Sequence, residues 1–243
     1  MTTKYAGIAM MVGILLSIVA SLLYPGNTLV NGVDQTDFPA ALEVIADAPT
    51  LAHAMVFLSI LAMLLISFGA YGLFPLATRL GGLSGTLLKF GIIISIIEWS
   101  INIIGLGMRH FVTHLIQRAS NAAAGSEDQI LLEETALVIH TTLTAVFLAF
   151  ITIYPFATML VGYGVGKLIQ TMNAFKIGAN VLLVSGAAGL ITYLAAMFVP
   201  GDEPVVYLMI FNILLFIGSI CLFIVGLGMY RGSEGLSEEA ASS

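Results

Sequence analysis

The chain has 243 residues, of which 59% are hydrophobic and only 9% are charged. A soluble domain usually carries about 25% charged residues, so this composition excludes an ordinary soluble protein. The net charge is −6, and no segment carries a basic stripe, so nucleic acid is not an expected partner. The lipid bilayer is the expected environment.

Six apolar segments are each long enough to cross about 30 Å of hydrocarbon, which takes roughly 20 residues. Backbone groups in lipid must bond one another within a segment, so each span is predicted to be a helix. The predicted spans are about 5–24, 51–74, 88–109, 135–163, 176–199 and 205–230. The expected fold class is therefore all-α: a polytopic integral membrane protein with a six-helix transmembrane bundle, forming a single domain over 1–232.

The first span begins close to the N-terminus, where a signal peptide would lie. Its apolar run is long and has no clear small-x-small cleavage site before Tyr24, so we interpret it as a retained helix. No organelle-targeting segment is recognisable, which favours a multi-pass protein of the cell membrane, with a bacterial inner membrane as the expected location.

Basic residues indicate how the helices are oriented. If the spans alternate in direction, six of the eight basic residues lie on one side and two on the other. The larger group is Lys4, Arg79, Lys89, Lys167, Lys176 and Arg231, and the smaller is Arg109 and Arg118. The side richer in lysine and arginine is usually cytoplasmic, so both termini are predicted to be cytoplasmic.

Three segments outside the spans have their own patterns. Residues 37–47 combine an aspartate, a proline and an apolar face, which predicts a short amphipathic helix on the outer side. Residues 109–134 continue the pattern of spans three and four around a break at 121–125, which predicts a protruding helical hairpin. The acidic tail, 233–243, is predicted to be a disordered cytoplasmic segment.

All four histidines fall on the predicted outer side: His53, His110, His114 and His140. His110 and His114 are four residues apart, so on a helix their imidazoles point the same way. His53 begins span two and His140 lies near the outer end of span four. Neutral imidazole is a common ligand of Zn, Cu and Fe, so we interpret the four as metal ligands. The alternative is that each is an interfacial side chain reaching the headgroups.

Two further residues belong to this prediction. Glu133 and Glu134 precede His140 by about two helical turns, and their carboxylates are expected either to complete the metal site or to orient its histidines. A haem b would instead need two axial imidazoles from different helices, most simply His53 with His140 or with His110. The expected cofactor is thus a haem b or a Cu, Zn or Fe ion.

Glu98 is the one ionisable residue deep inside a span. An intramembrane carboxyl is costly to bury, which makes a proton relay or cation path the functional interpretation. The alternative is a protonated carboxyl hydrogen-bonded to a neighbouring helix.

Small residues also recur within three spans, at Gly105-Leu106-Gly107, at Ser185-Gly186 and at Gly226-Leu227-Gly228. They predict close helix packing.

Three functions follow from these features. The first is a redox or metal-handling membrane protein that uses the histidines. The second is a non-enzymatic accessory subunit that packs against other membrane subunits, and the third is a small transporter that uses Glu98. The sequence leaves open whether the protein is an enzyme.

Overall fold

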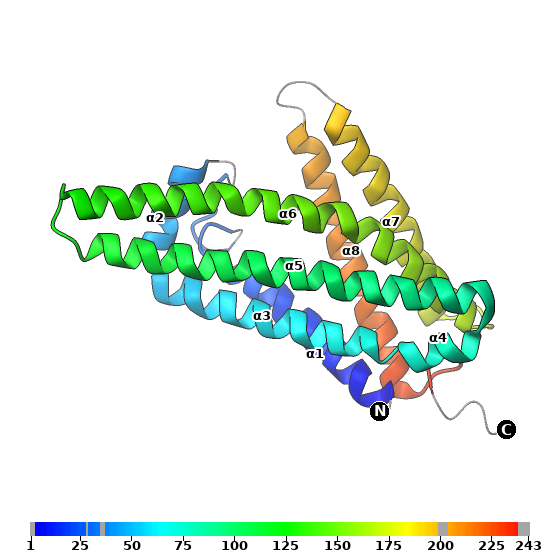
Figure 1. Ribbon diagram of the computed structural model, residues 1–243. Helices are drawn as coiled ribbons and strands as arrows, with labels where there is room; N and C mark the ends of the chain where they lie inside the picture. The colour runs from blue at the N-terminus through cyan, green and yellow to red at the C-terminus, as the bar shows by residue number, and fades with distance from the viewer. Residues whose placement is uncertain (1–2, 28, 35–36, 199–203, 238–243) are drawn as a thin grey trace. The chain divides into compact units, whose positions relative to one another are not determined.

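The computed structural model describes residues 3–27, 29–34, 37–198 and 204–237, which form eight α-helices (Figure 1). These are α1 (Thr3–Leu23), α2 (Phe38–Asp47), α3 (Pro49–Tyr71), α4 (Phe74–Leu80), α5 (Gly82–Ser120), α6 (Glu127–Leu168), α7 (Ala174–Phe198) and α8 (Pro204–Arg231). Six helical segments in the described part are long and apolar enough to cross a membrane. The all-α class and the six spans are confirmed, whereas the side on which the termini lie stays a prediction.

The helices α5 and α6 are much longer than a membrane span requires. They contain 39 and 42 residues, which at 1.5 Å per residue is roughly 60 Å each, about twice the hydrocarbon thickness. The turn between them lies at the predicted break, and the Ser126 hydroxyl accepts from the backbone N–H of Gln129 at 3.2 Å, capping the start of α6. The predicted helical hairpin is present.

The helix of the second predicted span, 51–74, ends just before the predicted boundary, and a separate short helix follows. Helix α3 ends at Tyr71, and α4 begins at Phe74 with Pro75 in its first turn, where a missing backbone N–H costs nothing. Pro155 differs because it lies inside α6 without ending that helix. Of the two prolines, therefore, only Pro75 marks a helix boundary.

The chain forms two compact units. Unit 1 comprises residues 1–14, 64–99 and 150–243, and unit 2 comprises residues 15–63 and 100–149. Unit 1 holds α4, α7 and α8, and unit 2 holds α2 and the turn of the α5–α6 hairpin. In unit 2 the neighbouring halves of α5 and α6 run side by side (Figure 1). The single membrane domain over 1–232 stays a prediction.

Small residues set the helix spacing in unit 1. A Cβ atom on Gly7 of α1 would collide with the carbonyl oxygen of Gly226 on α8. A Cβ on Gly186 of α7 would lie 2.8 Å from the backbone nitrogen of Met159 on α6. The close packing predicted around Gly186 and Gly226 is confirmed, whereas the prediction is wrong at Gly107, because an added Cβ there meets no heavy atom within 4 Å.

The first residues of the acidic tail, 233–237, pack against other parts of unit 1. Arg79 donates hydrogen bonds to the carbonyls of Gly235 and Ser237 at 2.8 and 2.6 Å, and Leu236 is fully buried. The prediction of a disordered tail is wrong for 233–237, because the acidic composition concealed one leucine that gains by burial and two carbonyls within reach of a guanidinium. Residues 238–243 lie outside the described part of the chain.

Candidate functional site

Three of the four histidines gather in unit 2. His53 lies in the second turn of α3, and His110 and His114 are one turn apart on α5. The ring centroid of His53 lies 4.3 Å from that of His110 and 5.0 Å from that of His114. The centroids of the two α5 rings are 5.9 Å apart. We call these three residues the histidine cluster. The two α5 histidines, whose i, i+4 spacing was noted in the sequence, are thus contacted by an imidazole from a second helix, α3.

Hydrogen bonds define the tautomers of the cluster. The Nε2 atom of His53 lies 3.0 Å from Gln117 Oε1, and its Nδ1 atom lies 3.1 Å from Nδ1 of His110. An amide oxygen can only accept, so His53 donates through Nε2 and keeps a lone pair on Nδ1. His110 must then donate the proton shared between the two Nδ1 atoms.

The cluster is accessible as well as ordered. His53 and His110 are half-buried, and His114 is exposed. Among the residues described, no three His, Cys, Asp or Glu side chains already stand around a common point suited to a metal ion. The arrangement therefore offers two imidazoles with adjoining nitrogens and a third within one side-chain rotation.

His140 does not join the cluster. It is 5% exposed, and its ring meets Phe38 of α2 edge-on, with the centroids 5.8 Å apart. Its Nδ1 atom has no hydrogen-bond partner in the described part of the chain, and Arg109 is close enough to interact with it electrostatically. Spacing along α6 contained no information on the direction in which His140 points.

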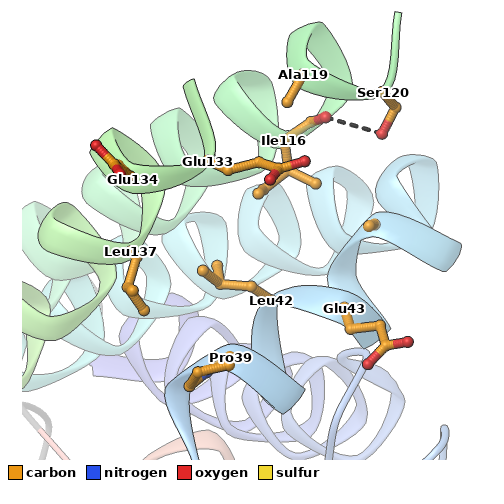
Figure 2. A pocket seen from close by; sticks show the side chains of 10 residues that line it. Pro39, Leu42, Glu43, Ile116, Ala119, Ser120, Glu133, Glu134 and Leu137 are labelled. Carbon is orange, nitrogen blue, oxygen red and sulfur yellow. Dashed lines mark hydrogen bonds between the residues drawn. The ribbon is translucent and has the colours of Figure 1, made fainter. Parts of the chain in front are cut away.

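Glu133 and Glu134 also lie elsewhere. They line an open groove of about 410 Å³ that has residues of α2 on one side and residues of α5 and α6 on the other (Figure 2). Glu133 accepts a hydrogen bond from Gln129 Nε2 at 2.9 Å. The groove is also lined by Pro39, Leu42, Glu43, Ala46, Ile116, Ala119, Ser120 and Leu137. The structure does not bring either carboxylate together with the histidine cluster.

Sequence reasoning missed Gln117. It lies three residues after His114 and seven after His110, so all three share one face of α5. This i, i+4, i+7 spacing of polar residues was the available signal.

Glu98 lies in unit 1, apart from this chemistry. It is 1% exposed, and its Oε1 atom has no hydrogen-bond partner among the described residues. It shares a small, largely apolar cavity with Ser95, Tyr154 and Thr158. The carboxyl is therefore deeply enclosed, as its sequence position predicted.

Comparison with known proteins found no matching family model, no similar curated protein and no similar solved structure.

Proposed function

We propose that this multi-pass membrane protein binds a divalent transition metal ion at the histidine cluster and has a metal-handling or redox role. The observation that carries the proposal is the 3.1 Å approach of the Nδ1 atoms of His53 and His110. Two nitrogen ligands of a tetrahedral zinc ion, each at 2.0–2.1 Å, are roughly 3.3 Å apart. An ion can thus take the place of the shared proton with little movement of either ring, while that proton moves through solvent to Nε2 of His110, so that both imidazoles stay neutral.

The hydrogen bond from His53 to Gln117 supports the same interpretation. A metal-bound histidine almost always donates its other ring N–H to an oxygen, which fixes the tautomer and aims the free lone pair. Gln117 Oε1 has this relation to His53. The exposed His114 supplies a third nitrogen after a side-chain rotation, and water fills the remaining position.

A bare ion fits these contacts better than haem. One ring nitrogen of His53 contacts His110 and the other contacts Gln117, and the ring of His140 packs against Phe38. A bis-histidine haem between His53 and His140 would have to break both arrangements. Zinc needs no redox partner, whereas copper or iron at the same site adds electron transfer.

In this proposal the cluster faces the outer side of a cell membrane, a bacterial inner membrane being the expected one. The basic residues favour the other side of the bilayer for both termini. A metal ion would then be taken from the external solution.

Zinc titration of the purified chain in uncharged detergent tests the proposal. We expect one ion per chain, and an affinity loss of more than about 100-fold in His53→Ala and His110→Ala, because each removes a ligand. Gln117→Leu, which removes only the supporting oxygen, is expected to cost about 10–100-fold. Gln129→Leu and His140→Ala are matched controls and should bind as the unaltered chain does. Equal affinity in all five variants would refute the proposal.

Glu98 favours a second candidate function, a small proton-coupled transporter. Burying a carboxyl in the membrane with an unpartnered oxygen is energetically costly. Such a group is a default candidate for a proton or ion path. Proton flux into proteoliposomes is expected to fall at least tenfold in Glu98→Gln, with Glu43→Gln as the control. Unchanged flux in Glu98→Gln would remove this candidate.

A further inference from the structure

Unit 2 contains a second cavity, of about 170 Å³, whose described lining includes no histidine. Its polar lining comes from α1, the segment after α1, α3 and α5: Ser17, Ser21, Tyr24, Asn27, Ser59, Asn102 and Arg109. Several of these groups already have partners. Asn27 donates to the carbonyl of Ser21 at 2.7 Å, and Ser59 donates to that of Met55 at 2.8 Å. The cavity is therefore a polar chamber, and among its lining residues Tyr24 and Arg109 have a buried polar atom without a hydrogen-bond partner in the described part of the chain.

Arg109 brings an unsatisfied positive group to this chamber. Its guanidinium carbon lies 4.6 Å from the ring centroid of Tyr24 and 5.1 Å from that of Phe147, so two aromatic faces flank the cation. Its Nε atom is buried and has no hydrogen-bond partner among the described residues. A buried guanidinium N–H without an acceptor is costly, which points to an acceptor that is not part of the described chain.

Tyr24 provides a second, independent donor. The side chain is 4% exposed, and in the described part of the chain its hydroxyl has no hydrogen-bond partner. Thr113 lies close enough to interact with this hydroxyl, and its own hydroxyl donates to the backbone carbonyl of Arg109 at 3.0 Å. A buried tyrosine hydroxyl normally finds a partner, and Tyr24 lines the same cavity as Arg109, whose Nε atom has no partner among the described residues.

We infer that this cavity binds the carboxylate group of a small organic acid, with Arg109 and Tyr24 donating to its oxygens. The single fixed positive charge matches a monoanion better than a phosphate dianion. Met63, Leu106 and Phe147 line the rest of the cavity and suit a short hydrocarbon chain. The volume equals that of roughly six water molecules, which accommodates a carboxylate and a few carbons.

The same carboxylate chemistry has two sources. A short acid can enter from water, whereas a fatty acid can enter from the bilayer with its tail left in lipid. Butyrate represents the first source, decanoate the second, and butyramide is a neutral control of matched shape.

Calorimetric titration of the full chain in uncharged detergent tests the inference. We expect butyrate or decanoate to bind, and butyramide and inorganic phosphate to bind at least tenfold more weakly. Tighter binding of decanoate assigns the site to acids from the bilayer, and equal binding of both acids assigns it to acids from water; either result supports the carboxylate site. Binding of neither acid overturns it, as does tighter binding of phosphate.

Two variants locate the binding. Arg109→Gln is expected to weaken carboxylate binding at least tenfold, and Tyr24→Phe, which removes one hydroxyl and keeps the ring, by about threefold to tenfold. Arg118→Gln, an exposed position on the same helix, is the control and should not change it. If Arg109→Gln does not fold, Tyr24→Phe alone decides, and unchanged carboxylate affinity in that variant refutes the inference.

Discussion

At the scale of single residues, the histidine cluster depends on one proton. His53 donates to Gln117, so the remaining proton between the two Nδ1 atoms comes from His110. A metal ion takes the place of this proton, which moves to Nε2 of His110, and a further proton on either imidazole removes the lone pair that the ion needs. The cluster is therefore expected to respond to pH through its ligands.

Zinc affinity should fall as the solution is acidified. Imidazole binds a metal ion only when it is neutral, so protons oppose binding increasingly as the pH falls. We expect the Kd for zinc to rise at least tenfold between pH 7.5 and pH 5.5, measured by titration in the same detergent. A Kd that is constant over this range would exclude imidazole ligands, and His140→Ala should leave the profile unchanged.

Residue spacing predicted part of this site. The separation of His110 and His114 placed their rings on one face of α5, as the structure has them. Spacing within one helix contains no information on which neighbour a residue faces, so the different surroundings of His53 and His140 were not predictable. Gln117 was missed because an amide is not itself a ligand.

At the scale of elements, glycine contacts determine how closely the long helices of unit 1 pack. A Cβ on Gly162 of α6 would lie 2.8 Å from the carbonyl oxygen of Ala179 and would also meet the backbone of Leu183, both on α7. These are backbone atoms that cannot rotate away. The steric clash can therefore be removed only if the two helices move apart.

Gly162→Ala should therefore destabilise the protein although alanine is the better helix former. We expect a loss of about 1–3 kcal/mol from overpacking, measured by thermal unfolding in detergent. Gly107→Ala is the matched control, because no heavy atom lies within 4 Å of its added Cβ, and it should be neutral or stabilising by up to about 1 kcal/mol. Equal stability of the two variants would contradict the packing described for α6 and α7.

The helices themselves were largely predictable. Apolar runs and polar breaks identified the six spans, the α5–α6 turn and α2, whose N-cap Asp37 accepts from Ala40 N at 3.2 Å. The division at Tyr71 was not predicted, because Pro75 is compatible with both a kink and a new helix. The packed start of the tail was missed because Leu236 lies alone among polar residues.

At the scale of the whole molecule, charge and histidine content separate between the two units. All six basic residues of the predicted cytoplasmic group lie in unit 1, whereas the four histidines, Arg109 and Arg118 lie in unit 2. Within unit 1, the Lys4 ammonium lies 5.3 Å from the ring centroid of Tyr230, which brings the two ends of that unit's sequence together. The partition accords with the orientation predicted from the basic residues and assigns the proposed ligand chemistry to unit 2.

X-ray absorption at the zinc edge of the zinc-loaded chain tests the central claim most directly, since it identifies the atoms around the ion. We predict a nearest shell of nitrogen at about 2.0–2.1 Å with the outer scattering of at least two imidazoles, lost in His53→Ala and in His110→Ala. An oxygen-only shell, or an imidazole shell that persists in both variants, would contradict the proposal that this cluster binds the metal.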